Sequence, residues 1–82
     1  MEAYRKLEEA QLITESDEAF KLKVHFTGNF PPEDVWFPKS QIETETNELG
    51  EILAFYATEW IIDQKQEEFE EYLLVGEIIS PS

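Results

Sequence analysis

Residues 19–26 carry the strictest hydrophobic pattern in the chain. Four apolar side chains alternate there with three basic ones, in the order Phe20-Lys21-Leu22-Lys23-Val24-His25-Phe26. A period of two residues is typical of a β-strand that buries one of its faces. Residues 11–15 also favour a strand, and residues 16–18 provide a turn between the two. We therefore expect an antiparallel hairpin over residues 11–26, with the four apolar side chains buried and Lys21 and Lys23 exposed.

Short apolar runs bounded by turn residues continue this β-type pattern as far as residue 57. Residues 27–33 contain a Gly-Asn pair and two prolines, so they are expected to form a loop. Val35-Trp36-Phe37 predicts a short strand that Pro38 ends or restricts to a sheet edge. Residues 42–46 and 51–57 give two further strands, joined by a turn at residues 47–50.

A helix is expected after these strands. Thr58 is suited to cap its N-terminus, and Glu59 is favourably placed in the first turn. We expect the helix to span residues 59–72, with one buried stripe made of Ile62, Phe69, Tyr72 and Leu73. The secondary structure of two segments is left undecided by the sequence pattern. Residues 1–10 form either a short helix or a flexible, extended lead, and residues 76–82 form either a final strand or a flexible tail.

The order of these elements predicts an α+β fold. Four to five short strands followed by one C-terminal helix are best accommodated by a small, bent antiparallel sheet. Such a sheet would be an SH3-like or OB-like partial barrel, with the helix covering one open side. A chain of 82 residues has apolar surface for one core, so we expect residues 1–82 to form a single domain.

Composition excludes several ways of stabilising or localising such a domain. The chain has no cysteine and a single histidine, so it can form neither a disulfide nor a zinc site of the usual type. No apolar run approaches the roughly 20 residues that span a bilayer, and the first residues do not resemble a secretory signal. We therefore expect a cytoplasmic protein, without cofactor or metal, that is stabilised by packing.

The net charge of −13 is the second strong constraint. A surface this acidic repels nucleic acids and anionic membranes unless the few cations gather on one face, and it attracts basic proteins. Residues 58–82 alone hold seven acids and one lysine. The simplest interpretation is that the acids keep a small protein soluble.

One motif resembles a known pattern. The run Val35-Trp36-Phe37-Pro38-Lys39-Ser40-Gln41-Ile42 resembles a strand found in small uncharacterised proteins of bacteria, phages and plasmids. There the motif is followed by a hairpin and by a second tryptophan near the start of a helix, a position that Trp60 matches. The resemblance spans residues 12–65 and implies a compact β-rich fold in a bacterial or phage context. The loop at residues 27–34 and the acidic segment after Lys65 depart from it.

The motif has a structural and a functional interpretation. In the first, Trp36 packs into the core, Pro38 ends the strand, and Ser40 or Gln41 bonds to freed backbone groups. In the second, Trp36 or Phe37 is exposed beside Lys39 and forms a stacking surface for single-stranded nucleic acid. Strand alternation places Trp36 opposite to Phe37, so we expect one ring inside and the other outside. Lys21, Lys23 and His25 share one strand face, which is either solvated or joins Lys39 in a basic patch.

The acids flanking Phe69 also have two interpretations. They are either a solvated helix face or a phosphate-like array that mimics nucleic acid and binds a basic cleft. The array would consist of Glu67, Glu68, Glu70 and Glu71, extended by Glu43, Glu45, Glu48 and Glu51.

Catalysis is not expected, because the chain has no cysteine nucleophile and no glycine-rich phosphate loop. We predict a non-enzymatic binding protein whose partner is a protein. The alternatives are a single-stranded nucleic-acid binder that uses Trp36 or Phe37 with Lys21, Lys23 and Lys39, and an inhibitor that mimics nucleic acid.

Overall fold

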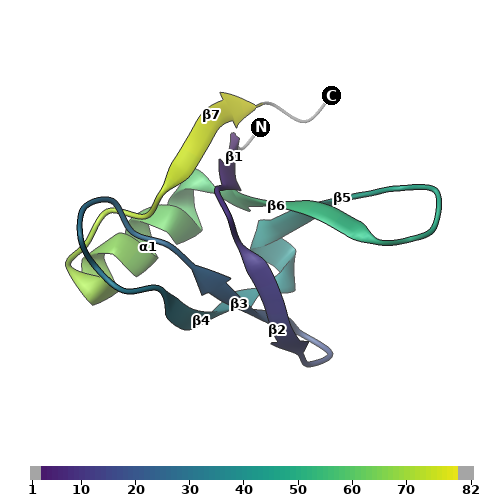
Figure 1. The fold of residues 1–82 in the computed structure, drawn as a ribbon, viewed down its shortest axis with the longest axis horizontal. Helices are drawn as coiled ribbons and strands as arrows, with labels where there is room; N and C mark the ends of the chain where they lie inside the picture. The colour runs from purple at the N-terminus through teal and green to yellow at the C-terminus, as the bar shows by residue number, and fades with distance from the viewer. Residues whose placement is uncertain (1–2, 80–82) are drawn as a thin grey trace.

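A computed structural model describes residues 3–79, which form two antiparallel sheets and one helix (Figure 1). The first sheet has the strand order β5-β6-β1-β7, and the second has the order β2-β3-β4. The strands are β1 (Tyr4–Leu7), β2 (Gln11–Glu15), β3 (Ala19–Val24), β4 (Glu33–Pro38), β5 (Ile42–Thr46), β6 (Ile52–Thr58) and β7 (Val75–Ile79). A short 3-10 helix, η1 (Lys39–Gln41), links β4 to β5, and α1 (Glu59–Phe69) follows β6.

The second sheet confirms the predicted hairpin. Strand β2 pairs antiparallel with β3, and β3 pairs in turn with β4. The turn is held by the Ser16 side chain, whose hydroxyl accepts a hydrogen bond from the Ala19 amide at 3.1 Å. Leu22, Val24 and Phe26 are buried as predicted, whereas Phe20 is half-buried because it lies at the edge of the core. Lys21 and Lys23 are half-buried rather than fully exposed.

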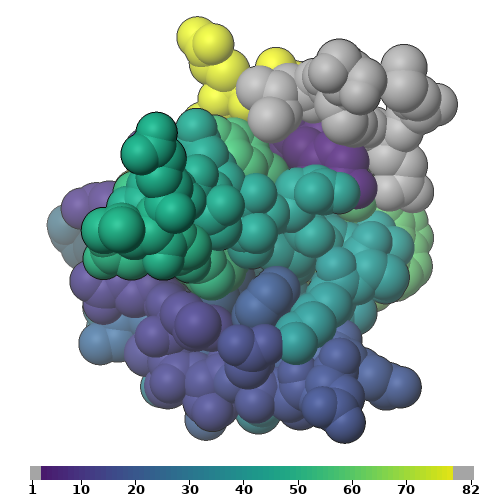
Figure 2. Space-filling view, turned by 90° about the vertical axis from the view of Figure 1, so that its right-hand side faces the viewer, coloured from purple at the N-terminus to yellow at the C-terminus, as the bar shows by residue number. Residues whose placement is uncertain are grey.

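Strands β5 and β6 form a hairpin that extends away from the body of the molecule (Figure 1). Its teal-to-green atoms stand out in Figure 2, which is viewed from the hairpin side. The turn is closed by Asn47, whose side-chain oxygen accepts hydrogen bonds from the amides of Leu49 and Glu51 at 2.9 and 3.0 Å. The two predicted strands and the turn between them are therefore present.

The first sheet contains two strands beyond the four or five expected. Within the undecided segment 1–10, residues 4–7 form β1, a strand between β6 and β7 rather than a helix or a flexible lead. Residues 75–79 form β7, so the chain returns to the sheet after the helix. Residues 1–2 and 80–82 of the two undecided segments lie outside the described part.

The helix is shorter than predicted. It ends at Phe69 instead of residue 72, because Glu70 adopts a left-handed conformation with φ 58° and ψ 31° that terminates the helical hydrogen-bond pattern. Tyr72 therefore leaves the predicted buried stripe and is 72% exposed, while Ile62 and Leu73 are buried and Phe69 is half-buried.

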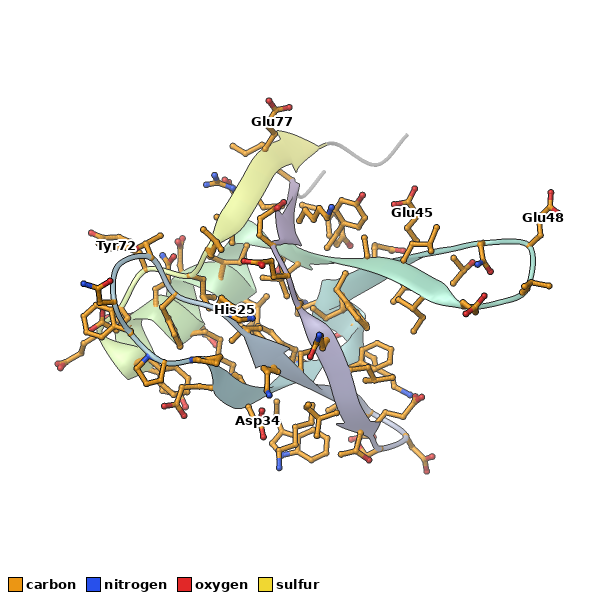
Figure 3. The ribbon with its side chains drawn as sticks, viewed as in Figure 1. His25, Asp34, Glu45, Glu48, Tyr72 and Glu77 are labelled. Carbon is orange, nitrogen blue, oxygen red and sulfur yellow. The ribbon has the colours of Figure 1, made fainter. Side chains whose placement is uncertain are left out.

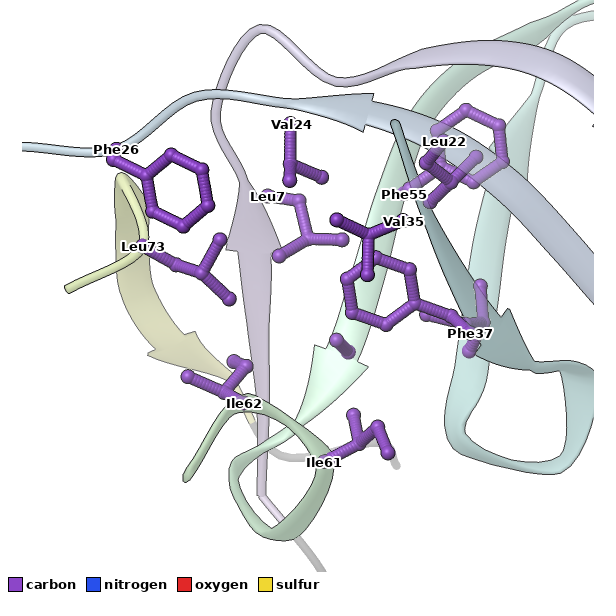
Figure 4. Close-up of a cluster of buried hydrophobic side chains, with 12 residues drawn as sticks. Leu7, Leu22, Val24, Phe26, Val35, Phe37, Phe55, Ile61, Ile62 and Leu73 are labelled. Atoms are coloured by element: carbon purple, nitrogen blue, oxygen red, sulfur yellow. The ribbon is translucent and has the colours of Figure 1, made fainter. Parts of the chain in front are cut away.

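One hydrophobic core lies between the two sheets and the helix (Figure 4). Each sheet supplies one face, and α1 adds Ile61 and Ile62. Within residues 3–79 the strands form two separate hydrogen-bonded sheets and no closed barrel. The same residues contain no helix with the length and apolar character needed to cross a bilayer. The core side chains are Leu7, Leu22, Val24, Phe26, Val35, Phe37, Ile42, Phe55, Ala57, Ile61, Ile62 and Leu73.

Candidate functional site

The two aromatic residues of the tryptophan motif point to opposite faces of β4. Phe37 is fully buried, and Trp36 is 44% exposed. The predicted division into one inner and one outer ring is therefore confirmed. The interpretation in which Trp36 packs into the core is wrong, because the inward positions of β4 belong to Val35 and Phe37. The second tryptophan, Trp60, is also exposed, on the first turn of α1.

Lys39 does not join Trp36 in a stacking surface. Its ammonium group is paired with the Glu15 carboxylate at 2.6 Å and lies 4.9 Å from the centre of the Phe20 ring. Phe20 pairs with Phe37 on the inner face of the sheet, whereas Trp36 is on the outer face. The charge of Lys39 is thus neutralised on the side of the sheet away from Trp36.

Gln41 shows what the polar end of the motif does. Its side-chain oxygen accepts a hydrogen bond of 2.6 Å from the Thr58 hydroxyl, which in turn accepts one of 3.2 Å from the Ile61 amide. Gln41 therefore bonds to the side chain that caps α1, and not to a freed backbone group as predicted. Ser40 is exposed. Through this hydrogen bond, the motif links η1 to the start of α1.

The outer face of the second sheet carries the remaining cations of the predicted patch. The Lys21 ammonium lies 5.9 Å from the centre of the Trp36 ring, and the two residues are cross-strand partners. Lys23 is the cross-strand partner of Asp34, which carries the opposite charge. His25 lies beyond the end of β3. We call Trp36, Lys21 and Lys23 the tryptophan face.

The predicted acidic residues lie at the C-terminal end of α1. Glu67, Glu70 and Glu71 line a surface groove of about 380 Å³. Asp63 adds a fourth carboxylate, and Gln66 and the exposed Tyr72 complete the walls. Glu68 is not part of the groove, and its carboxylate lies 3.4 Å from the Lys65 ammonium. We call this site the acidic groove, lined by Asp63, Gln66, Glu67, Glu70, Glu71 and Tyr72.

The acids of the hairpin do not extend this array. Glu45 and Glu48 lie at the opposite end of the molecule from Tyr72 (Figure 3). Glu45 instead accepts a hydrogen bond of 3.2 Å from the Tyr56 hydroxyl. Partial burial of the phenol raises the pKa of Tyr56 above its ordinary value, and the bond to Glu45 with the nearby carboxylate charge raises it further.

The acidic groove is costly for the stability of α1. The C-terminal end of a helix carries a partial negative charge, so it favours cations and disfavours carboxylates. The last turn of α1 has no basic residue. Glu70 also occupies the left-handed region, where glycine is the preferred residue. A basic side chain in the last turn, or a glycine in place of Glu70, would therefore make the helix more stable than these carboxylates do.

Sequence reasoning missed a second pocket, which lies beside the acidic groove. It is an aromatic pocket of about 130 Å³, lined by Phe26, Phe30, Pro31, Glu33, Phe69 and Glu71. Phe26 pairs with Leu73 in an isolated antiparallel bridge, which brings the loop after β3 against the end of α1. No local pattern in the sequence could indicate this contact between distant segments. The available signal was the loop at residues 27–34, which departs from the pattern that the tryptophan motif resembles.

The described residues contain no cluster of histidine and carboxylate side chains that could hold a metal ion. Comparison of the chain with protein-family models, with curated proteins and with solved structures found no match. The resemblance carried by residues 35–42 and by Trp60 thus stays a prediction.

Proposed function

We propose that this chain is a non-enzymatic binding protein that docks a basic surface of a partner protein in its acidic groove. The observation that carries the proposal is the groove itself. It is concave, it presents four carboxylates from Asp63, Glu67, Glu70 and Glu71, and the exposed ring of Tyr72 forms part of its wall. Complementary charge speeds such an encounter and fixes its orientation.

The loss of helix stability caused by the acids of the groove supports a binding role over a role in solubility. Acids placed anywhere on the surface would keep the protein soluble. Glu67 and Glu70, in contrast, lie at the C-terminal end of α1, where they oppose the helix dipole, and Glu70 adds backbone strain. Strain in such a position is commonly retained where function requires the side chain. A basic partner would offset the repulsion among the four carboxylates.

The chemistry of the groove favours a protein over a nucleic acid as its occupant. Carboxylates repel phosphates, whereas they pair with lysine and arginine side chains. Tyr72 offers an apolar ring and a polar hydroxyl, a combination enriched in protein interfaces. If the partner is a nucleic-acid-binding protein, the groove acts as a phosphate mimic, and the protein is an inhibitor of the kind considered from the sequence.

The test compares two variants of equal charge. One replaces the four groove carboxylates, by Asp63→Asn, Glu67→Gln, Glu70→Gln and Glu71→Gln, and its matched control replaces Glu43, Glu45, Glu48 and Glu51 on the hairpin by glutamine. An oligolysine peptide is titrated into each protein at low ionic strength, and binding is followed by calorimetry and by NMR of the labelled protein. We expect the helix variant to lose about tenfold or more in affinity and the hairpin variant to lose little. Equal losses would show that the acids act only through net charge and would refute the proposal.

A second candidate function is supported by the tryptophan face. Trp36 is exposed, and Lys21 lies over its ring. Lys23 is two residues after Lys21 on the same face of β3. An exposed ring with nearby cations is the usual arrangement for stacking a nucleic-acid base. It ranks second because Lys39 is withdrawn into an ion pair and Asp34 lies opposite Lys23. A labelled oligothymidine that fails to bind at roughly 100 μM and low salt would eliminate it.

The finer description of the fold is part of the same proposal. The two sheets, joined through η1 and capped by α1, are consistent with an SH3-like or OB-like partial barrel. The cytoplasmic location and the bacterial or phage context remain predictions from the sequence.

A further inference from the structure

The aromatic pocket lies between the loop after β3 and the end of α1. Its floor contains the rings of Phe26 and Phe69, whose centres are 5.7 Å apart at an angle of 52°. Phe30, which is 51% exposed, and Pro31 form one wall. The backbone at Gly28 has φ 84°, and a Cβ atom there would lie 3.4 Å from the Phe30 ring. The glycine lets the loop turn closely past this ring.

Backbone hydrogen bonds hold the pocket in place. The Thr27 amide donates to the Tyr72 carbonyl oxygen, and the Leu74 amide donates to the His25 carbonyl oxygen, each at 2.9 Å. These bonds flank the Phe26–Leu73 bridge, and Figure 4 shows the Phe26 and Leu73 side chains near each other at one end of the core. The Leu73 amide also donates to the Gln66 side chain at 2.9 Å. The pocket is therefore preformed, and its occupant need not order it.

The lining combines aromatic faces with two carboxylates. Three phenylalanine rings and a proline give the pocket an apolar interior, and Glu33 and Glu71 add negative charge. Aromatic faces attract cations, and carboxylates pair with them. At about 130 Å³ the pocket is smaller than the roughly 300–1,000 Å³ that enclose a drug-sized ligand. Its volume suits a single side chain with an aliphatic stem and a cationic end.

We propose that the aromatic pocket binds one lysine or arginine side chain of the partner protein as the anchor of the complex. This inference rests on the proposed function. Glu71 lines both the pocket and the acidic groove, so the two hollows adjoin at the end of α1. A basic segment can place one cationic side chain in the pocket while its neighbours pair with the carboxylates of the groove. Buried anchors of this kind dominate the affinity of most interfaces.

The test uses n-butylammonium, which reproduces the lysine side chain from Cβ to Nζ, and 1-butanol as its neutral counterpart of equal chain length. Each is titrated into the labelled protein, and the NMR signals of Phe26, Phe30 and Phe69 are followed. We expect n-butylammonium to shift these signals with an affinity about threefold or more above that of 1-butanol. Equal affinities would show that the pocket selects apolar bulk rather than charge, and would overturn the inference.

Two variants of the pocket test which of its residues bind n-butylammonium. Replacing Glu33 and Glu71 by glutamine should reduce n-butylammonium binding about threefold or more, whereas replacing Glu48 and Glu51 on the hairpin should leave it unchanged. Phe30→Leu keeps an apolar wall but removes one aromatic face, and because Phe30 is exposed we expect the variant to remain folded. We expect Phe30→Leu to weaken the binding of n-butylammonium and to leave the binding of 1-butanol unchanged. Retention of n-butylammonium binding in both pocket variants would overturn the inference.

The same variants separate this inference from the proposed function. If oligolysine binding depends on the groove acids but not on Phe30, the function stands and the anchor does not exist. If n-butylammonium binds in the pocket while the helix and hairpin variants bind oligolysine equally, the pocket stands as an amine site and the proposed function fails.

Discussion

Replacing Glu70 by glycine is expected to make the protein more stable while weakening its binding of a basic partner. Glu70 follows α1 with φ 58° and ψ 31°, a conformation that side chains with a Cβ atom adopt at a cost. Its carboxylate also lies at the negative end of the helix dipole. Glycine removes both costs, because it has neither a Cβ atom nor a charge.

The size of the gain follows from three contributions. Relief of the left-handed conformation is worth about 1–2 kcal/mol. Removal of the charge adds about 0.3–1 kcal/mol at low salt. The greater freedom of glycine in the unfolded chain subtracts about 0.4–1 kcal/mol. The net expectation is a stabilisation of roughly 1–2 kcal/mol, and each 1 kcal/mol raises the Tm of a domain of this size by about 4–8 °C.

Thermal and urea denaturation of Glu70→Gly and Glu70→Gln separate the contributions. Glu70→Gln removes only the charge, so its gain should be smaller and should fade as salt is added. The further gain of Glu70→Gly should persist at high salt, because backbone strain is not screened. If Glu70→Gly were neutral or destabilising, the strain assigned to this residue would be wrong.

Glu9 provides the matched control for the functional part of the prediction. It is exposed and also has a positive φ, 59°, in the turn between β1 and β2. Glu9→Gly removes one charge and one strained residue, as Glu70→Gly does. Both variants should be more stable, but only Glu70→Gly should weaken oligolysine binding. Equal weakening in the two variants would mean that the position of the carboxylate is irrelevant.

Three other predictions concern the framework of the fold. Leu22→Ala should cost about 3–5 kcal/mol in urea denaturation, because Leu22 is fully buried in the core, and a cost under about 1 kcal/mol would contradict its position. Thr58→Ala should cost about 1–3 kcal/mol, because it removes the helix cap and leaves the Gln41 oxygen without its donor; Thr58→Ser should recover most of this loss. Because the pKa of Tyr56 is higher in the folded than in the unfolded protein, the protonated phenol stabilises the fold. This contribution to the free energy of unfolding is complete below about pH 10 and is lost as the pH rises through the pKa of the folded protein. Glu45→Gln should lower that pKa in an NMR titration of the Tyr56 ring, and an unchanged value would contradict the contribution of the Glu45 charge.

The parts of the fold predicted correctly are those whose signals are local. The alternation at Leu22 and Val24 identified a strand with one buried face, and the neighbouring turn fixed its partner. Alternation along β4 likewise predicted that one of the rings of Trp36 and Phe37 lies inside and the other outside, but it left open which one, and the structure exposes Trp36. Thr58 caps α1 as predicted, since a cap depends only on the residues that follow it.

The parts that were missed depend on contacts between distant segments. Residues 4–7 have no clear alternation, and β1 is a strand because β6 and β7 pair with it on both sides. Lys39 left the predicted basic patch because the fold brings Glu15 within 2.6 Å of it. The end of α1 had no glycine to mark it, and the aromatic pocket depends on the pairing of Phe26 with Leu73. None of these contacts has a signature within a short window of sequence.

The position of β1 in the first sheet has a consequence for how the chain folds. Tyr4 pairs with Thr58 on one side and with Ile79 on the other, so the earliest strand finds its partners only after most of the chain has been synthesised. The β2-β3-β4 meander, in contrast, joins neighbours in sequence and can form first. Closing long loops is slow, and proteins dominated by such contacts fold in milliseconds to seconds. Until β6 emerges from the ribosome, β1 remains an unpaired strand that is open to pairing with other chains.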